Sequence, residues 1–240
     1  MPLLRLPQAA HDLLGIDLSP EQQAAFERYQ SEMVAWNETR ANLTAITEPL
    51  GVEMRHFLDS LSVLRVARVR EGTRVIDVGT GAGFPGLPLK IVCPAINLTL
   101  LEATGKKTAF LEEIVNLLKL RNVRVVNARA EDAGHDPAHR EGYDLVLARA
   151  VAQMPILVEY LLPLARIGGR CIAMKGEGAA QEAALADKAL RMLGGRLSHL
   201  TPVELPHVAE THYLVEIEKI VATPPQFPRK PGIPSKKPIE

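Results

Sequence analysis

Residues 75–86 read Val-Ile-Asp-Val-Gly-Thr-Gly-Ala-Gly-Phe-Pro-Gly. The apolar, β-branched run from Val75 to Val78 predicts a buried parallel strand that carries one acidic residue, Asp77. Glycines at alternate positions then let the backbone turn sharply and approach a ligand where a Cβ would clash. The three glycines are Gly79, Gly81 and Gly83. Pro85 suits the first turn of a helix, so the whole stretch predicts a nucleotide-binding site.

Two classes of cofactor use such a loop, and the register of the glycines separates them. The dinucleotide fingerprint G-x-G-x-x-G is matched only formally, by Gly81, Gly83 and Gly86. The register G-x-G-x-G, with Asp77 two residues before its first glycine, agrees better with class I S-adenosylmethionine (SAM) methyltransferases. A second apolar run, residues 96–101, ends at Glu102. An acid at this strand end binds a ribose diol in both classes, so Glu102 predicts an adenosine ligand without choosing between them.

Residues 71–221 alternate between strand and helix patterns and form the predicted SAM-dependent methyltransferase domain. The expected strands are residues 73–78, 96–101, 123–127, 144–149, 169–175, 197–204 and 212–219. The expected helices are residues 86–92, 104–119, 153–165 and 177–193. The alternation predicts an α/β fold with a Rossmann-like, mostly parallel sheet. No crossover helix fits between the last two strands, so we expect a C-terminal antiparallel hairpin, the usual end of a class I SAM methyltransferase sheet.

Residues 1–70 predict a helical extension in front of this sheet. Ser19-Pro20-Glu21 has the pattern of a helix start with Ser19 as its cap. Side chains at helical spacing follow it and predict a buried stripe of Phe26, Tyr29, Met33 and either Trp36 or Asn37. A second helix is expected over residues 49–66, with a buried face of Met54, Phe57, Leu58, Leu61 and Leu64.

Residues 222–240 form a tail that is rich in proline and carries one acid. Its basic residues are Arg229, Lys230, Lys236 and Lys237. Such a segment cannot bury enough apolar area to fold alone. Composition leaves two interpretations open. The tail is either a solvated end, or an arm that contacts phosphates and loses little entropy on docking because of its prolines.

Composition excludes several other classes of protein. The chain of 240 residues has 28 basic and 28 acidic side chains, so no global basic field indicates nucleic acid. Cys93 and Cys171 match no metal-ligand spacing and predict reduced core residues. No run of about 18 apolar residues predicts a membrane span, and the first residues lack an export signal. We therefore expect a cytoplasmic protein without a metal, and no exposed apolar repeat requires a partner, which favours a monomer.

Three strand ends carry further candidate residues. After the third strand, Glu131, Asp132 or a backbone N–H is placed to bond the adenine edge, with a helix cap by Asp132 as the alternative. Ligands of open α/β sheets bind at the carboxyl ends of strands, so Arg149 should point into the active crevice. A surface ion pair is the alternative for Arg149. Lys175 lies at the end of the fifth strand and faces either substrate or solvent.

The sequence also lacks groups that several methyl transfers require. The fourth strand does not end in Asn-Pro-Pro-Tyr or Asp-Pro-Pro-Tyr, the loop that grips an exocyclic amine. Neither cysteine is placed to attack a pyrimidine ring, and no catalytic base dyad is evident. A ring nitrogen with a free lone pair, such as guanine N7, needs no base, because its methylation rests on proximity, orientation and desolvation. Arg149 would donate to guanine O6 and aim N7 at the methyl group.

Further motifs follow one another in order along nearly the whole chain. They are Trp36-Asn37, Asn42-Leu43-Thr44, Arg55-His56-Phe57-Leu58-Asp59-Ser60-Leu61, Asp77 to Gly86, Glu102 with Lys106-Lys107, Arg129-Ala130-Glu131-Asp132, Ala148-Arg149-Ala150-Val151, Lys175-Gly176 and Arg229 to Pro238. Together they resemble the bacterial 16S ribosomal RNA guanine-N7 methyltransferase family (RsmG, or glucose-inhibited division protein B). Gly-Ala-Gly-Phe-Pro-Gly with Ala-Arg-Ala-Val is far more specific than a generic SAM motif.

The resemblance implies methyl transfer from SAM to N7 of a guanine in 16S ribosomal RNA, within the small ribosomal subunit or its RNA. The candidate cofactor-binding residues are Asp77, Gly79, Gly81, Gly83, Phe84, Glu102, Ala103, Thr104, Ala130, Glu131 and Arg149. Arg149 and Lys175 are the candidate catalytic residues. The resemblance favours RNA contacts by Arg229, Lys230, Lys236 and Lys237. A small-molecule SAM methyltransferase and a non-catalytic ribosome assembly factor remain the alternatives.

Overall fold

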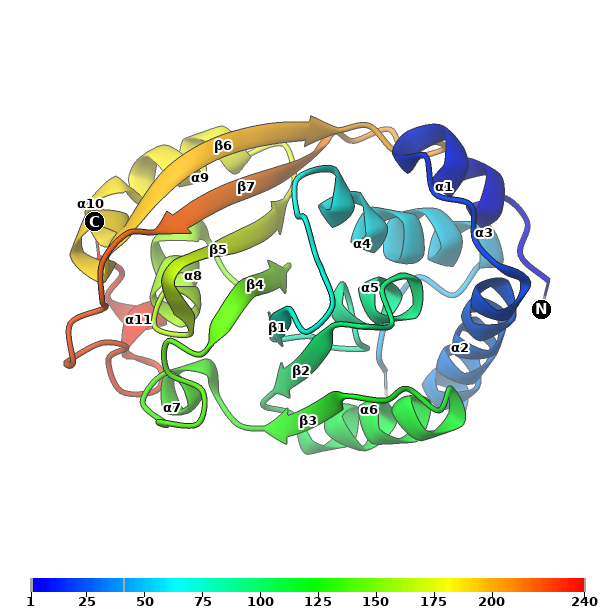
Figure 1. Cartoon of the computed structure of the whole chain (residues 1–240), viewed down its shortest axis with the longest axis horizontal. Helices are drawn as coiled ribbons and strands as arrows, with labels where there is room; N and C mark the ends of the chain where they lie inside the picture. Colours follow the sequence, from blue (N-terminus) through cyan, green and yellow to red (C-terminus); the bar gives the residue numbers. More distant parts are fainter. Residues whose placement is uncertain (1, 41, 240) are drawn as a thin grey trace.

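The computed structural model describes residues 2–40 and 42–239, which contain a seven-stranded sheet of order β3-β2-β1-β4-β5-β7-β6 (Figure 1). The strands are β1 (Arg74–Val78), β2 (Asn97–Glu102), β3 (Val123–Asn127), β4 (Tyr143–Arg149), β5 (Ala165–Lys175), β6 (Gly195–Val203) and β7 (His212–Lys219). Strands β1 to β5 pair in parallel, and β7 is antiparallel to both β5 and β6. The predicted sheet, including its antiparallel hairpin, is confirmed.

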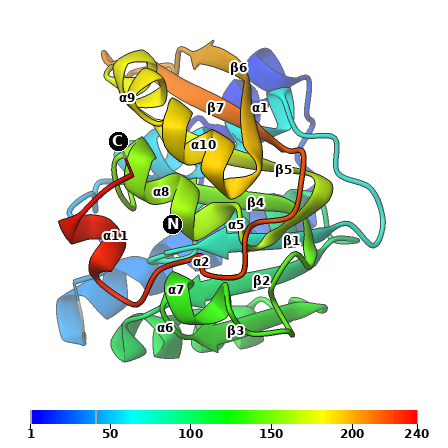
Figure 2. The same cartoon turned by 90° about the vertical axis from the view of Figure 1, so that its left-hand side faces the viewer.

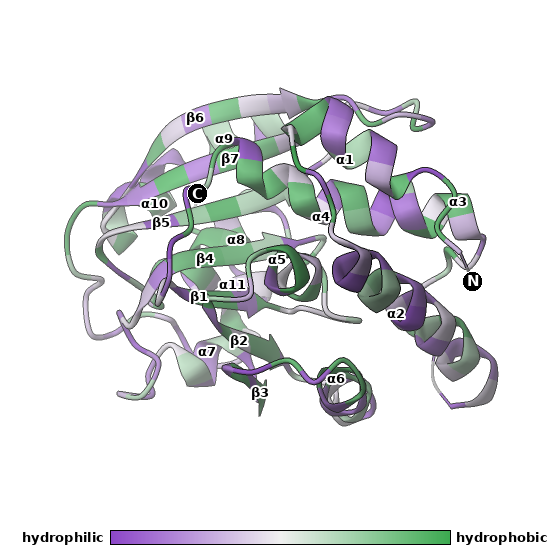
Figure 3. Cartoon of the chain, turned by 45° about the vertical axis from the view of Figure 1, so that its right-hand side comes forward, coloured by the Kyte–Doolittle hydropathy of each residue, from purple (hydrophilic) through white to green (hydrophobic). Residues whose placement is uncertain are grey.

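Successive residues of the central strands face opposite layers, as the pleat requires. Val75 and Leu147 belong to a core shared with the N-terminal helices, whereas Ile76 and Val146 belong to a second core on the other face. Figure 3 shows β1, β2 and β4 as largely hydrophobic ribbons. This composition is typical of parallel strands that are covered on both faces.

The helices that follow the strands differ from the prediction at several ends. They are α5 (Gly86–Val92), α6 (Gly105–Leu117), α7 (Ala130–Ala133), α8 (Met154–Leu161), α9 (Ala179–Leu185) and α10 (Asp187–Leu193). The helix expected over 177–193 is two helices separated by Ala186. The helix expected over 153–165 ends at Leu161, because β5 already begins at Ala165. Helices α8, α9 and α10 cover one face of the sheet (Figure 2).

The N-terminal part packs on the opposite face, next to α5 and α6 (Figure 1). Its elements are α1 (Leu6–Leu14), α2 (Pro20–Thr39), α3 (Pro49–Val52), the π-helix η1 (Glu53–Leu58), α4 (Asp59–Leu61) and the 3-10 helix η2 (Ser62–Arg65). The predicted start of α2 is confirmed, since the Ser19 side chain accepts from the Gln22 backbone N–H at 3.3 Å. The single helix expected over 49–66 is instead a series of turns of different pitch.

A buried carboxylate fixes α1 against this irregular segment. Glu53 is fully buried, and it accepts the backbone N–H groups of Leu4, Arg5 and Leu6 at 2.7, 2.8 and 2.7 Å. The first N–H groups of a helix have no partner within the helix, so an acid at that end both bonds them and complements the helix dipole. The carboxylate therefore joins two segments that are far apart in the sequence.

The apolar stripe of α2 reaches the glycine loop that follows β1. Its predicted members Phe26, Tyr29 and Met33 are buried, and of the two candidates for the last position Trp36 is buried and Asn37 is only partly buried. The hydroxyl of Tyr29 donates a hydrogen bond to the carbonyl of Ala82 inside the loop. The N-terminal extension therefore shares a core with the sheet, and Tyr29 holds the glycine loop by a hydrogen bond.

Residues 222–239 lie along the molecule as an ordered segment, here called the C-terminal strap, which passes α7 and α8 (Figure 2). Phe227 and Ile239 are buried in the second core, and the strap ends with α11 (Ile233–Lys236). The Arg140 guanidinium donates to the carbonyls of Thr223 and Phe227, both at 2.8 Å. A fully solvated tail does not agree with these contacts.

Positions 1 and 41 of the predicted extension and position 240 of the predicted tail lie outside the described residues. Among the described residues, no helix has the length and apolar character needed to cross a membrane. Within the same residues, no group of three or more His, Cys, Asp or Glu side chains is arranged to hold a metal ion.

We predict that Tyr29→Phe destabilises the protein by about 1–2 kcal/mol, because the buried Ala82 carbonyl loses its donor while the ring remains. Urea unfolding measures the change. Tyr213→Phe is the control, because the Tyr213 hydroxyl has no hydrogen-bond partner among the residues that the structure describes. Equal stability of the two variants would contradict the assigned support of the loop.

Candidate active site

The glycine loop is shaped by backbone conformations that only glycine adopts easily. Gly79 and Gly83 have φ values of +65° and +101°. A Cβ on Gly79 would lie 2.8 Å from a methyl carbon of Val151, and one on Gly83 would lie 2.4 Å from Leu87. The loop therefore requires glycine for its turn and for the close packing around it.

Asp77 holds this loop from inside the protein. It is fully buried, and its Oδ2 accepts from the Thr80 hydroxyl at 2.5 Å and from the Gly86 backbone N–H at 2.8 Å. Burial raises the pKa of Asp77 to about 6, against the opposing effect of these two hydrogen bonds. These contacts join β1 to the loop and to the first residue of α5, and the predicted contact of Asp77 with the cofactor stays a prediction.

A slot of about 150 Å³, here called the adenosine slot, opens at the ends of β1, β2 and β3. Its lining residues are Val78, Gly79, Leu101, Glu102, Ala103, Ala128, Arg129, Ala130, Glu131, Val151 and Tyr160. The Glu102 carboxylate is oriented by two backbone donors, the N–H of Gly81 at 3.0 Å and that of Thr104 at 2.9 Å. A carboxylate at this strand end accepts from a ribose diol, and apolar walls suit a flat base. The residues present therefore fit the adenosine half of SAM.

The predicted adenine-side acid has a partner from the C-terminal strap. Glu131 lies in α7, is almost fully buried, and accepts from the Gly232 backbone N–H at 3.0 Å. Asp132 does not cap this helix, because the N-cap is Arg129 and no side chain bonds there. Tyr160 of α8 also lines the slot, and sequence reasoning missed it because one aromatic residue within a helix gives no signal.

A second cavity of about 460 Å³ lies beside this slot, at the same edge of the sheet. The pairing of Arg149 with Met174 and of Lys175 with Tyr213 brings the ends of β4 and β5 and the start of β7 together. The cavity is lined by Ile46, Arg55, His56, Asp59, Arg149, Ala150, Met174, Lys175, Gly176, Glu182 and His212. Both predicted catalytic residues therefore face one cavity.

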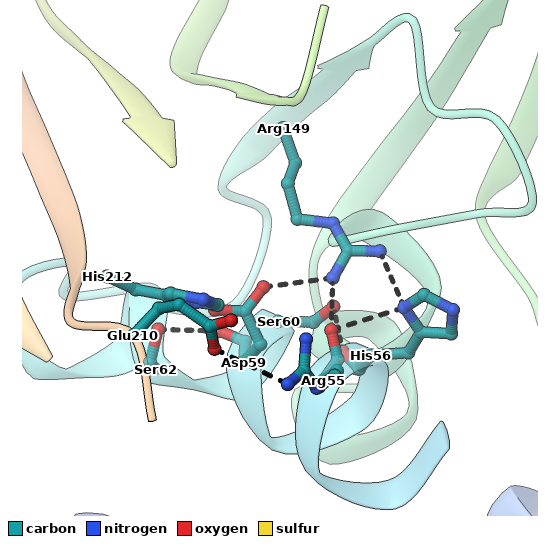
Figure 4. A network of polar contacts seen from close by, with 8 residues as sticks. All are labelled: Arg55, His56, Asp59, Ser60, Ser62, Arg149, Glu210 and His212. Atoms are coloured by element: carbon teal, nitrogen blue, oxygen red, sulfur yellow. Dashed lines mark hydrogen bonds and ion pairs between the residues drawn. The ribbon is translucent and has the colours of Figure 1, made fainter. Parts of the chain in front are cut away.

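Three acceptors fix the Arg149 guanidinium at the wall of this cavity (Figure 4). Its Nη1 donates to the Asp59 carboxylate and to the Arg55 carbonyl, both at 2.9 Å, and its Nη2 lies 3.2 Å from Nδ1 of His56. The Asp59 side chain is 4% exposed and that of Arg149 is 16% exposed, so this is not a surface ion pair. Arg149 does not line the adenosine slot, and its predicted cofactor contact stays a prediction.

Phe84 supports the same wall. Its ring stacks on that of His56 with centroids 4.6 Å apart, and the Arg149 guanidinium lies 4.9 Å from the ring centroid. Only 4% of Phe84 is exposed, and its other neighbours include Tyr29. The ring therefore packs beneath the second cavity, and its contact with the cofactor stays a prediction.

Lys175 is also paired. Its Nζ donates to the Glu182 carboxylate and to the Ala152 carbonyl, both at 2.6 Å. Glu182 lies in α9 and accepts in addition from the backbone N–H of Met154, the first residue of α8. Lys175 thus joins β5 to two helices while it lines the cavity.

The four basic residues predicted to bind RNA differ in environment. Arg229 bonds the fully buried Glu159, with its Nη2 at 2.7 Å and its backbone N–H at 2.7 Å from the carboxylate oxygens. It anchors the strap to α8. Lys230, Lys236 and Lys237 are exposed on the strap.

The fold and the site define a class of protein, the class I SAM-dependent methyltransferases. Solved structures support this class at the level of the fold. One is a SAM-dependent methyltransferase from Aquifex aeolicus, with TM-score 0.54 and 19% identity over 80% of this chain and 98% of that chain. Another, M. jannaschii TYW2 in complex with AdoMet, has TM-score 0.51 and 18% identity over 63% of this chain and 71% of that chain.

The particular family follows from closer relatives. Residues 22–209 match the family model GidB, described as rRNA small subunit methyltransferase G. The chain is 51% identical over 225 residues to the ribosomal RNA small subunit methyltransferase G of Roseiflexus castenholzii, which covers 94% of this chain and 95% of the relative. The chain belongs to this family, as its motifs predicted.

The two histidines of the second cavity should titrate far apart. Burial and the neighbouring Arg149 lower the pKa of His56 to about 4, whereas the hydrogen bond to Asp59 raises the pKa of His212 above 6.5. Imidazole NMR of the folded protein should therefore show His56 neutral at pH 6 and His212 still largely protonated at that pH. Coincident titration near pH 6.5 would contradict the two environments.

The lowered pKa of His56 also has a consequence for stability. The unfolded chain binds this proton first, so His56 destabilises the fold as the pH falls from about 6.5 towards about 4. Asp77 acts in the opposite direction, because its raised pKa makes the folded chain bind a proton first. The two residues therefore change the free energy of unfolding in opposite directions as the pH falls. Because their sum hides each contribution, the titration of each residue is best followed by NMR.

Proposed function

We propose that this protein transfers the methyl group of SAM to N7 of a guanine in 16S ribosomal RNA. Membership in the rRNA small subunit methyltransferase G family supports SAM-dependent methylation of ribosomal RNA. The choice of the N7 atom is supported by one observation, the arrangement of the second cavity. That cavity presents fixed hydrogen-bond donors, Arg149 and Lys175, beside the adenosine slot.

The chemistry agrees with a target that carries no proton. SAM supplies a methyl group on a positively charged sulfur, and the attacking atom must reach it in line. His56 is engaged at both ring nitrogens, because Nδ1 faces Arg149 and Nε2 lies 2.8 Å from the Thr44 hydroxyl. The Asp59 carboxylate is bonded by Arg149 and His212. His56 and Asp59 are therefore engaged in orienting contacts, and methylation of a lone pair needs no group that removes a proton.

Arg149 is the residue that orients the base in this proposal. Its three contacts do not use all N–H donors of the guanidinium, so a donor remains for guanine O6. A hydrogen bond to O6 leaves the N7 lone pair free and directs it to one side of the ring. Lys175, which lines the same cavity, is the second positioning cation.

The remaining parts of the proposal concern partners. The exposed Lys230, Lys236 and Lys237 contact RNA phosphates, and the strap that carries them is anchored beside the adenosine slot by Arg229 and Gly232. An enzyme with this substrate acts in the cytoplasm. We propose a monomer, because the large apolar side chains that the described residues expose are scattered over different elements.

The direct test uses methyl-labelled SAM and small ribosomal subunits that lack N7-methylguanine. We expect label in 16S RNA and cleavage at a single guanine by N7-specific strand scission. SAM binding without label in RNA would overturn the proposed substrate and favour a small acceptor or a non-catalytic role. Label at an atom other than N7 would overturn the proposed chemistry alone.

Glu102→Ala should raise the dissociation constant of SAM about tenfold or more, because a hydrogen bond to a charged group contributes about 1.5–3 kcal/mol. Isothermal titration calorimetry measures the change. Glu112→Ala, on the exposed surface of α6, is the control for removal of a carboxylate. Unchanged SAM affinity in the Glu102 variant would exclude this residue as the ribose ligand.

Replacement of Lys230, Lys236 and Lys237 by Gln should flatten the salt dependence of RNA binding, by roughly 0.7–0.9 in the log–log slope for each phosphate that the protein no longer neutralises. Lys119→Gln/Arg121→Gln is the control, because these exposed residues precede β3, whereas the strap contacts Glu131 beyond the other end of that strand. Filter binding at several salt concentrations measures both slopes. If the salt-dependence slope of the strap variant equals that of the wild-type protein, the strap lysines do not contact RNA.

A further inference from the structure

Asp59 joins two cavity residues that come from distant parts of the chain. Its Oδ2 accepts from Arg149 at 2.9 Å, and its Oδ1 lies 2.7 Å from Nδ1 of His212 (Figure 4). Asp59 begins α4, Arg149 ends β4, and His212 begins β7. Because β5 lies between β4 and β7, the carboxylate bridges over one strand at the active edge of the sheet.

We infer that Asp59 and His212 form a positioning pair that fixes the Arg149 guanidinium for the target base. This inference rests on the function proposed above and assigns roles to two residues that no motif of the SAM fold explains. A buried carboxylate with both oxygens bonded to cationic groups has a single favourable orientation. His212 occupies the second oxygen and thereby keeps the first directed at Arg149.

The burial of these side chains distinguishes the residue that positions Arg149 from the residues that are exposed to a bound base. Asp59 is 3% exposed as a residue, so the carboxylate is hidden behind the side chains that it holds. All three residues line the cavity, but the side chains of Arg149 and His212 are 16% and 27% exposed, and they occupy both carboxylate oxygens of Asp59. Asp59 therefore acts through Arg149, whose second nitrogen is in turn fixed by His56 and whose face lies on Phe84.

A second carboxylate near the same cavity, Glu210, serves as the control for the loss of charge at Asp59. Glu210 approaches Arg55 at 3.4 Å, and both of these side chains are largely exposed, 53% and 42%. An exposed ion pair contributes little because water screens it. Glu210→Gln thus removes the same charge as Asp59→Asn from the same neighbourhood without touching Arg149.

The first experiment compares Asp59→Asn with Glu210→Gln in steady-state methylation of the small subunit. We expect Asp59→Asn to lower kcat by about 10²-fold, because misplacement of an orienting group by about 1 Å has effects of that size. KM for the subunit should change little, since phosphate contacts elsewhere dominate affinity. SAM affinity should be unchanged, because Asp59 does not line the adenosine slot. A kcat of Asp59→Asn equal to that of Glu210→Gln would overturn the inference.

His212 provides a second test that does not depend on the stability of Asp59→Asn. In His212→Asn the side-chain amide replaces the Nδ1 donor to Asp59, whereas His212→Ala removes that donor. A positioning role predicts that His212→Asn retains most of the kcat that His212→Ala loses. If both variants lose kcat equally, the outer ring nitrogen contacts substrate directly and the positioning role of His212 is wrong.

Two further readouts separate failure of this inference from failure of the proposed function. The effects of Asp59→Asn and Arg149→Gln should be far from additive, because one acts through the other. Imidazole NMR of Asp59→Asn without substrate should show the His212 pKa moving down towards 6.5. If that pKa falls but the wild-type protein methylates no RNA, the pair is present and the proposed substrate is wrong. An unchanged His212 pKa would overturn the pair itself.

Discussion

The buried carboxylate of Asp77 is the contact on which the cofactor side of the molecule depends. One oxygen of Asp77 accepts from the Thr80 hydroxyl and from the Gly86 N–H. A single side chain thereby joins the end of β1, the glycine loop and the start of α5. Helix α5 has no other side-chain cap, and the first N–H groups of a helix need an acceptor. Because the loop then lies at a fixed height above the sheet, Gly81 can donate to Glu102 and orient it.

The N-terminal helices extend this support to the other half of the site. Tyr29 bonds the carbonyl of Ala82 within the loop, and η1 with α4 supplies His56 and Asp59 to the second cavity. Phe84 lies between the two halves, with Tyr29 on one side and His56 stacked on another. The extension is thus part of the candidate active site, because its side chains fix the loop and form one wall of the cavity.

Local sequence patterns predicted the sheet, the glycine loop and the strand-end residues, because these depend on periodicity and on glycine conformation. The same patterns placed Arg149 and Lys175 at one edge, since parallel strands end together. Sequence reasoning missed Glu182 and His212, because each reaches the site through strand pairing or helix packing between distant segments. Asp59 was noted only within a family motif, and its two partners were not apparent. The sequence did not predict the change of helical pitch over residues 49–65, because the spacing of its apolar residues still agrees with a regular α-helix.

The charges around the second cavity are arranged in pairs, which bears on the chemistry. Methyl transfer to N7 moves a positive charge from sulfur to the guanine ring, so a strongly cationic cavity would oppose the product. Arg149 is paired with Asp59, and Lys175 with Glu182. Each pair offers N–H donors to the base while its carboxylate limits the positive potential that the methylated ring would meet. Orientation by paired cations is therefore compatible with a cationic product.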